Sequence, residues 1–285
     1  MRNSSGAHVG QWSLGETDSD TVEASGVDNG VSVFTVWTEH VPASGGNLIR
    51  GGFVTYAGAI GASNILVGTG TSDFGQPSVA FNGESYLLAC FIHGDPDVDG
   101  SNDQLLLAEI SSAGTTSASE AVELTNPTAN RAVGRPVAVW AGTKWAVLWQ
   151  ESHDGTGVDT YLHLTTKVPT GVALDTDLRT QWNPPITDFT ARQTGEIDMV
   201  WTGSRLGIAI KHDGLTAGKN VYFAEFSADG ARAGDAALRI NNAGTSNYNP
   251  SIAFTQAGGN QHYLFSWLQY SAEIYQINVA AFGCD

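Results

Sequence analysis

The sequence has few cysteines, few basic residues and no long apolar run. Its 285 residues include two cysteines and 13 lysine or arginine residues, against 29 aspartate or glutamate residues. Two cysteines cannot form a disulfide framework. We expect Cys90 to be a buried thiol in a strand and Cys284 to be free, rather than a bridge between them. The net charge of −16 leaves no basic face, so nucleic acid and anionic membranes are not expected partners.

No apolar stretch approaches the roughly 20 residues that a membrane-spanning helix needs, so we predict no membrane partner. The N-terminal residues MRNSSGAHVG also lack the apolar core of a secretory signal. The acidic surface and low lysine content are nevertheless typical of a matured, secreted or extracellular protein. We expect that protein to be a monomer.

What the sequence does contain favours strands. Hydrophobic residues make up 41% and aromatic residues 9%, and glycine occurs 34 times. Residues of high β propensity are plentiful, whereas good helix formers are scarce. This composition predicts an all-β protein with a substantial core.

An internal repeat organises the chain. Similar segments begin near residues 77, 136, 197 and 250, with a weaker copy near residue 21, so that the copies are 53 to 61 residues apart. Each period contains short apolar runs separated by turns such as NGE, AGT or SADG. Turn signals every 8–12 residues indicate antiparallel sheets. Four strands repeated radially predict a β-propeller.

The number of repeats predicts a single five-bladed propeller over residues 1–285. The last copy is short, and residues 1–20 precede the first copy. We therefore expect residues 1–20, with AHVGQWSLGE as a strand, to complete the last blade and close the ring.

The copies around VLWQESHDG and AIKHDG resemble repeats of secreted bacterial propellers of the sialidase-like kind, in which a strand ends in W-x-D-x-R-x-G. This resemblance implies the fold and a carbohydrate ligand. The chain departs from the pattern because His153 stands where the arginine usually is. Complete Asp-box motifs (S-x-D-x-G-x-T-W) are absent, and no arginine triad can be assigned.

The loop DPDVDGSND has the pattern D-x-D-x-D-G-x-x-D. Calcium requires six to eight oxygen ligands, and alternate residues of a tight turn can direct their carboxylates inward together. We predict a structural Ca²⁺ in blade two with ligands from Asp95, Asp97, Asp99, Ser101 and Asp103. The pattern resembles calcium loops of integrin-type propellers, and it departs from an EF-hand because Leu106 replaces the bidentate glutamate. A solvated acidic loop is the alternative.

Four of the seven histidines, His40, His93, His153 and His212, follow the second strand of blades one to four. We counted two residues beyond the anchors Trp37, Phe91, Trp149, Ile210 and Trp267. This count predicts a polar ring of Glu39, His93, Glu151, His212 and Gln269, since residues i and i+2 of a strand share a side. The alternative is that these side chains only hydrogen-bond loop backbone.

The residues that enter the innermost strands are also polar: Asp20, Gln76, Arg135, Glu196 and Asn249. Loops from every blade converge around a propeller axis, so these side chains predict a central pocket. Asp20, Glu196 and Asp198 are candidates for inward carboxylates of the kind that glycoside hydrolases use. Trp182, in a long loop, is a candidate for stacking on a sugar.

Three functions remain open at this point. The pocket suits a hydroxylated glycan, with Glu39 or Glu151 and His93 or His212 exchanging protons. A multivalent lectin-like module would instead need like residues at like positions. A transition metal bound by His40, His93, His153 and His212 would make a third class, a metal-dependent enzyme.

Overall fold

The computed structural model describes most of the repeat region. The described residues are 21–42, 45–57, 59, 61, 63–68, 73–93, 104–122, 135–153, 157–166, 168, 175–177, 196–213, 219–241, 246–257, 260–271 and 274–284. They contain nineteen strands, and none of them forms a helix. Within these ranges there is accordingly no helix long and apolar enough to cross a membrane. The predicted all-β class is confirmed.

The strands group into five antiparallel units, which we call blades one to five. Blade one consists of β1 (Thr21–Asp28), β2 (Ser32–Val41), β3 (Gly46–Thr55) and β4 (Asn64–Val67). Blade two consists of β5 (Asp73–Phe81), β6 (Tyr86–His93), β7 (Gln104–Ile110) and β8 (Thr116–Val122). Blade three consists of β9 (Val137–Trp140), β10 (Trp145–His153), β11 (Gly157–Thr165) and β12 (Asp175–Asp177). Blade four consists of β13 (Ile197–Trp201), β14 (Arg205–Asp213), β15 (Lys219–Ser227) and β16 (Arg232–Arg239). Blade five consists of β17 (Ser246–Ala257), β18 (Asn260–Ser271) and β19 (Ile274–Cys284).

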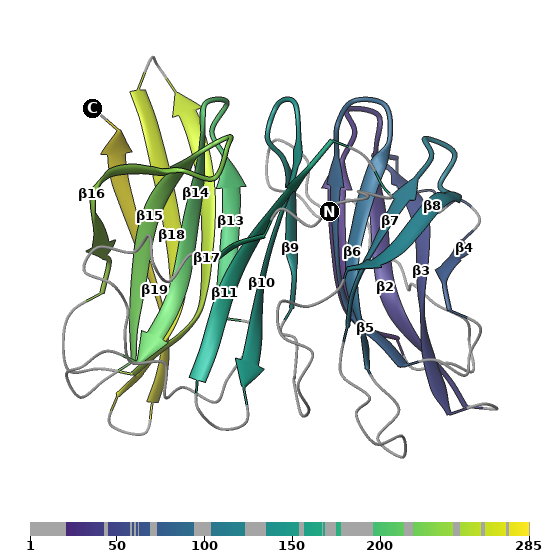
Figure 1. The fold of residues 1–285 in the computed structure, drawn as a ribbon, viewed down its shortest axis with the longest axis horizontal. Helices are drawn as coiled ribbons and strands as arrows, with labels where there is room; N and C mark the ends of the chain where they lie inside the picture. The colour runs from purple at the N-terminus through teal and green to yellow at the C-terminus, as the bar shows by residue number, and fades with distance from the viewer. Residues whose placement is uncertain are drawn as a thin grey trace.

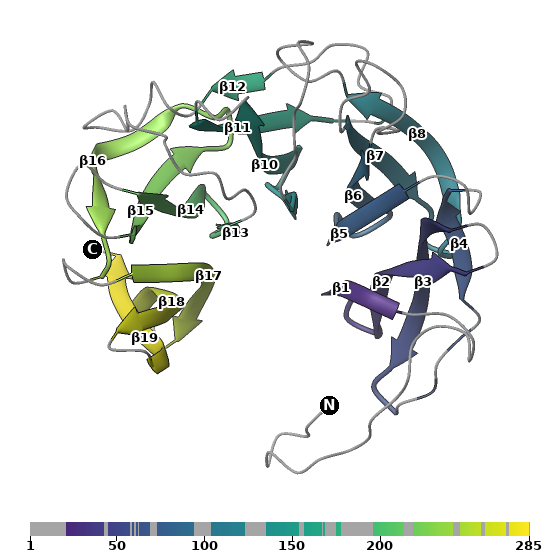
Figure 2. The ribbon, with the colours of Figure 1, turned by 90° about the horizontal axis from the view of Figure 1, so that it is seen from below.

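Each blade is a meander in which consecutive strands pair with each other. Blades one and two share one eight-stranded sheet only because Asn47 and Asp73 form a single parallel pair between β3 and β5. Figure 1 shows the blades standing side by side, and Figure 2 shows them from one end as an open arc. The innermost strands β1, β5, β9, β13 and β17 face the centre of this arc.

The blades are apolar on both faces because each one packs between two others. In β6, for example, Leu88 and Cys90 pack toward blade one, whereas Leu87 and Ala89 pack toward blade three. Four apolar layers result, one at each junction from blade one to blade five. A strand that is buried on both faces reads as a continuous apolar run, such as YLLACF in β6.

Three sequence predictions about the fold can now be compared with the structure. Each predicted repeat corresponds to one blade. Cys90 is fully buried and free, and burial raises the pKa of its thiol. Closure of the ring by residues 1–20 lies outside the described residues and stays a prediction.

Candidate functional site

The innermost strands of all five blades line one axial cavity of about 400 Å³. One residue at the same position of each innermost strand lines this cavity. We call these five residues the inner row. The inner row consists of Ser25, Ser78, Val137, Asp198 and Ser251. Their partners on the second strands are, in the same order, Val36, Ala89, Leu148, Ala209 and Ser266. This equal pairing makes the five positions structural counterparts.

Inner-row oxygens connect one blade to the next. Ser25, Ser78 and Asp198 each accept a hydrogen bond from a backbone amide on the innermost strand of the following blade, one residue beyond that blade's own inner-row position. The donor–acceptor pairs are Val79 N to Ser25 Oγ (3.4 Å), Ala138 N to Ser78 Oγ (3.0 Å) and Ile252 N to Asp198 Oδ2 (2.8 Å). Short polar side chains at these positions therefore satisfy buried amides that strand pairing leaves free.

A second set of residues lies two positions earlier, where the innermost strands begin, and we call it the entry row. It consists of Glu23, Gln76, Arg135, Glu196 and Asn249. Glu23 Oε2 accepts the amide of Gln76 at 2.8 Å, and Glu196 Oε2 accepts the amide of Asn249 at 3.1 Å. The entry row thus connects two pairs of adjacent blades in the same way.

Three entry-row residues adopt the left-handed backbone conformation. Their φ angles are 49° for Glu23, 49° for Gln76 and 47° for Asn249, and each lies at a β-bulge in its strand pairing. Left-handed φ is costly for residues other than glycine, and bulges re-aim side chains next to functional sites. The same bulge in three blades indicates that the fold maintains this entry to the cavity.

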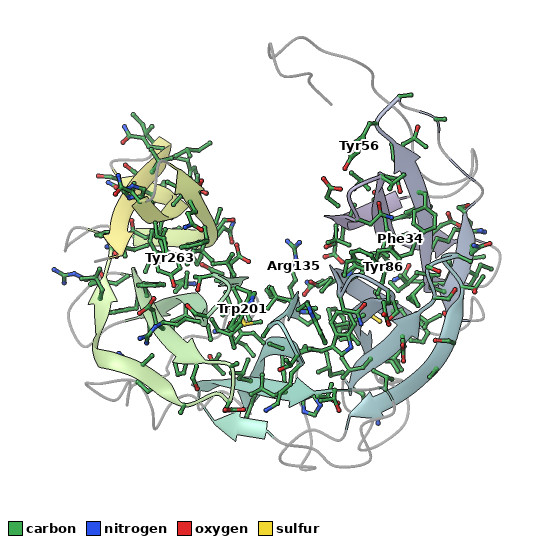
Figure 3. All side chains as sticks on the ribbon, turned by 90° about the horizontal axis from the view of Figure 1, so that it is seen from above. Phe34, Tyr56, Tyr86, Arg135, Trp201 and Tyr263 are labelled. Atoms are coloured by element: carbon green, nitrogen blue, oxygen red, sulfur yellow. The ribbon has the colours of Figure 1, made fainter. Side chains whose placement is uncertain are left out.

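Blade three departs from both rows. Val137 has no oxygen to offer, and the amide of Met199 is instead bonded by Asp198 Oδ1 at 2.9 Å. Arg135 replaces the entry-row acceptor, and its side chain points toward the centre of the arc (Figure 3). In the described part of the chain, no hydrogen bond or ion pair engages its guanidinium. Blade three therefore presents to the cavity of a strongly acidic protein a cation that is not ion-paired within the described residues.

Asp198 is the carboxylate of the cavity. Its Oδ2 accepts from Ser251 Oγ at 2.8 Å as well as from the Ile252 amide. Burial raises the pKa of Asp198 above its usual value, although these hydrogen bonds and the charge of Arg135 act in the opposite direction. A carboxyl group with a raised pKa beside a guanidinium can bind a polar ligand and exchange a proton with it.

Two other carboxylates of the predicted site are ion-paired. Glu196 Oε1 lies 2.5 Å from the ammonium of Lys211, which also lies over the ring of Tyr248. Glu39 is 2% exposed and its Oε1 lies 2.6 Å from Arg50 Nε. Each therefore forms an ion pair, whereas Asp198 forms none with the residues that the structure describes.

The pairing of strands corrects the predicted polar ring at one member. Ser78 pairs with Ala89, so the next residue, Cys90, and not Phe91, is the counterpart of Trp37 and Trp267. His93 is therefore one position out of step with Glu39, Glu151, His212 and Gln269, and alternate strand residues face opposite sides. His93 shares its position with His40 instead. The side chains of His93, Glu151, His153 and His212 lie outside the description.

His40 and one ring residue, Gln269, are described in detail. His40 Nδ1 lies 2.9 Å from Asn47 Oδ1, and Asn47 in turn donates to Asp73. Gln269 Oε1 accepts from Asn278 Nδ2 at 3.1 Å. Both side chains therefore bond to neighbouring strands.

Several candidates fall outside the described residues altogether: Asp20, Trp182, Asp95, Asp97, Asp99, Ser101 and Asp103. In the parts of the chain that are described, no group of three or more histidine, cysteine, aspartate or glutamate residues could hold a metal ion. The entry row of blade one is Glu23, not Asp20, because Glu23 shares the bulge and the φ angle of Gln76 and Asn249.

Sequence reasoning identified Asp198 as a candidate but missed the other inner-row residues, including the three serines. A signal was present, because the similar segments QPS, RPV and NPS occur at the same position of three blades. It was overlooked because Ser78 and Ser251 look like ordinary turn residues beside proline.

No protein-family model and no curated protein sequence matches this chain. Solved structures do. A Trypanosoma rangeli sialidase in complex with the inhibitor DANA has a TM-score of 0.60 at 11% identity, over 93% of this chain and 48% of that one. The same sialidase in complex with sialic acid has a TM-score of 0.57 at 12% identity, over 87% and 46% of the two chains.

The ectodomain of the parainfluenza virus 5 hemagglutinin-neuraminidase has a TM-score of 0.58 at 8% identity, over 99% of this chain and 73% of that one. The chain thus spans about half the length of the trypanosomal sialidases that it resembles. At these identities the likeness concerns the fold. The protein has a sialidase-like β-propeller fold.

Proposed function

We propose that this protein is an extracellular propeller that binds or processes a carbohydrate in its axial cavity. One observation carries the proposal: five innermost strands converge on a polar cavity that contains a buried carboxyl group, Asp198, and the guanidinium of Arg135, which forms no hydrogen bond or ion pair with other described residues. The fold likeness supports it, because the trypanosomal sialidase is described in complex with sialic acid.

The ligand proposed here is a sugar with a carboxylate or a dense set of hydroxyl groups. Arg135 offers paired donors to a carboxylate or to adjacent hydroxyl oxygens. Because the protein carries a net charge of −16, a cation at the axis is the feature that attracts an anionic group into the cavity. Asp198 accepts a sugar hydroxyl or, in a hydrolase, transfers a proton.

Between processing and binding, we favour a single asymmetric site that processes its ligand. A lectin with five equal sites needs like residues at like positions, and the inner row contains three serines, a valine and an aspartate. Glu39, His93, Glu151 and His212 remain proposed acid–base groups, with Gln269, Trp182 and Asp20 as proposed ligand contacts. The ion pairs of Glu39 and Glu196 make Asp198 the preferred carboxyl.

A site for a transition metal at His40, His93, His153 and His212 is the rival enzyme hypothesis. The strand register does not favour a site in which all four histidines bind one ion. His40 and His93 share a position, while His212 lies one residue before it and His153 one residue beyond it. Four nitrogens at about 2.0–2.2 Å from one point are difficult to obtain from three register positions.

The test is a glycan array followed by titration of the best glycan against Arg135→Ala. We expect binding to weaken by at least about tenfold, which corresponds to the loss of one charge-assisted hydrogen bond. Arg205→Ala is the matched control, because Arg205 is exposed and lies 4.0 Å from Glu225, away from the cavity lining. Equal binding by the two variants would refute the axial site. Five equivalent binding sites per chain would favour the lectin.

Two further proposals concern the architecture. We propose that Ca²⁺ binds Asp95, Asp97, Asp99, Ser101 and Asp103 and stabilises blade two. We also propose a five-bladed propeller, in which residues 1–20 supply a fourth strand to blade five. The support is that β4, β8, β12 and β16 each pair with the third strand of their blade, whereas the described residues provide no such partner for β19.

A further inference from the structure

Lys211 is a buried cation near the axial cavity, although it is not among the described residues that line it. It lies on β14 and is 7% exposed, and its ammonium nitrogen lies 2.5 Å from Oε1 of Glu196, which is 8% exposed. Burying a charge without a partner is costly, so each of these charges depends on the other. A buried ion pair often stabilises a fold no more than apolar residues of the same size would. The pair therefore calls for a role at its site.

Glu196 uses its second oxygen on blade five. Its Oε2 accepts the backbone amide of Asn249 at 3.1 Å. The ammonium of Lys211 also lies 5.2 Å from the centre of the ring of Tyr248, the residue before Asn249 on β17. Lys211 therefore reaches two consecutive residues of β17, one directly and one through Glu196.

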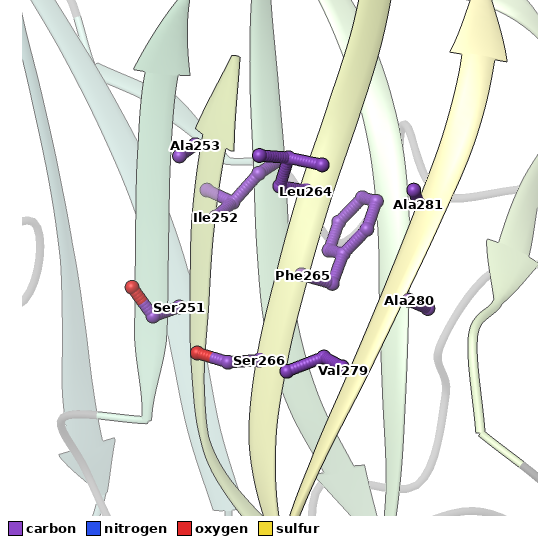
Figure 4. Close-up of a pocket in the computed structure, with 9 residues that line it drawn as sticks. All are labelled: Ser251, Ile252, Ala253, Leu264, Phe265, Ser266, Val279, Ala280 and Ala281. Carbon is purple, nitrogen blue, oxygen red and sulfur yellow. The ribbon is translucent and has the colours of Figure 1, made fainter. Parts of the chain in front are cut away.

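These two residues begin the bulge of β17. From Tyr248 to Ser251, β17 advances three residues while β18 advances two. Regular pairing resumes at Ser251, which lies beside Ser266 of β18 (Figure 4). Asn249 lies inside the bulge, has a φ angle of 47° and lines the cavity. A left-handed residue of this kind persists only where its surroundings hold it, so the contacts from blade four help to fix this wall of the cavity.

Asp198 holds the other end of the same bulge. Its Oδ2 accepts from Ser251 Oγ and from the Ile252 amide, both at 2.8 Å. Glu196 and Asp198 are two residues apart on β13, and alternate residues of a strand point to the same side. The two carboxylates therefore bind β17 at both ends of the bulge, and a shift of the bulge would also move the donors of Asp198.

Blades one and two have the same junction without a lysine. Glu23 Oε2 accepts the amide of Gln76 at 2.8 Å, but Glu23 is exposed, so water solvates its charge. Thr38 occupies the position of Lys211, since each lies two residues beyond the partner of an inner-row residue. Of these two junctions, the lysine thus occurs at the one where the entry-row carboxylate is buried.

We propose that Lys211 is a positioning residue of the axial cavity, which acts through Glu196 to hold the bulge of β17. Lys211 keeps Glu196 ionised, and an ionised carboxylate is a stronger acceptor for the Asn249 amide than a protonated one. Without the cation, Glu196 takes up a proton or turns toward water. The Asn249 amide then loses its acceptor and the cavity wall moves. The effect on a ligand rests on the proposed function, whereas the effect on the bulge does not.

The test compares Lys211→Met with the double variant Lys211→Met/Glu196→Gln. Methionine leaves Glu196 as a buried carboxylate without its cation, whereas glutamine offers Asn249 a neutral oxygen that needs none. Removing one partner of a buried ion pair is strongly destabilising, but replacing both by neutral groups is often tolerated. We expect hydrogen exchange at the Asn249 amide to be at least about tenfold faster in the single variant and within about threefold of the parent in the double variant.

Lys144→Met is the matched control. It removes the same charge from the protein, but the ion pair of Lys144 with Asp229 is on the surface. We expect this variant to leave exchange at Asn249 within about twofold of the parent. The Kd of a glycan that binds the parent should rise at least about threefold in Lys211→Met and return toward the parent value in the double variant.

Exchange at Asn249 that is unchanged in folded Lys211→Met, or equally fast in the control, would overturn the proposal. A double variant that exchanges as fast as the single one would do the same, because Lys211 would then act by its own packing and not through Glu196. If Lys211→Met does not fold, the double variant decides: parent-like folding and exchange support the proposal, and failure to fold refutes it. Faster exchange with an unchanged Kd would refute the positioning of the ligand. Faster exchange in a protein that binds no glycan would refute the proposed function but support the hold on the bulge.

Discussion

The innermost strands of blades two and five contain the segments QPS and NPS, whereas blade three has RPV at the corresponding position. The first two keep a left-handed entry residue and a serine in the inner row. Blade three has neither, and it presents Arg135 to the axis instead. The left-handed entry residue and the inner-row serine are therefore kept in blades two and five. In blade three they are replaced by an arginine and a valine at the cavity.

Asp198 combines the two roles. It replaces the missing oxygen of Val137 by accepting the Met199 amide, and it also performs the joining role of its own blade toward Ile252. It also lines the axial cavity together with Arg135, where the proposed ligand would bind. Substitutions at the inner row can separate these contributions.

Asp198→Ala should lower the free energy of unfolding more than any other substitution at the inner row. The change removes the acceptor of two backbone amides and of Ser251 Oγ. Hydrogen bonds to a charged acceptor contribute about 1.5–3 kcal/mol each, so we expect about 3 kcal/mol less free energy of unfolding. Denaturant titration measures it. Asp229→Ala is the control, because its ion pair with Lys144 is on the surface and should contribute less than about 1 kcal/mol.

Calcium removal should cause the next largest loss of stability, because it removes an ion that we propose to bind in blade two. If the ion is at about 100 times its Kd, chelation lowers stability by about 2.7 kcal/mol. Asp97→Ala should remove the difference between melts with and without EDTA. An unchanged melt in EDTA, together with no calcium in elemental analysis, would contradict a stabilising site.

Ser78→Ala should cost about 1–2 kcal/mol, because it leaves the buried amide of Ala138 without its acceptor. Ser25→Ala should cost about 0.5 kcal/mol or less, since the bond from Val79 is long at 3.4 Å. The reverse change in blade three is Val137→Ser, which adds a hydroxyl oxygen to the inner row. Because Asp198 Oδ1 already accepts the Met199 amide, we expect no increase in the free energy of unfolding. Equal losses from both serine variants would mean that the inner row does not join the blades.

The repeat period and the alternation of apolar residues were sufficient to predict the strands and their grouping. The sequence anchor of blade two is one residue off because Cys90 occupies the position that Trp37 and Trp267 occupy in blades one and five, and the aromatic residue Phe91 comes one residue later. The polar ring consequently included His93. The inner row escaped notice because its serines act on the amides of the next blade, a contact that depends on how blades stack and not on any one repeat.

Asp198 should also give the protein a small pH dependence of known sign. Burial raises the pKa of its carboxyl in the folded state, so the folded protein binds this proton more tightly than the unfolded chain. Stability contributed by Asp198 should therefore increase as the pH falls through the folded pKa, and level off below the ordinary value of about 3.8. The difference in unfolding free energy between the parent protein and Asp198→Asn isolates this group.

Asp28 supplies a control of opposite sign, because hydrogen bonds from Tyr56 and the Gly30 amide lower its pKa. Its contribution is present above the ordinary value and is lost as the pH falls through the lowered one. Denaturant titrations from pH 7 to pH 3 should show opposite slopes for Asp198→Asn and Asp28→Asn, and slopes of the same sign would mean that Asp198 is not held in a desolvated site.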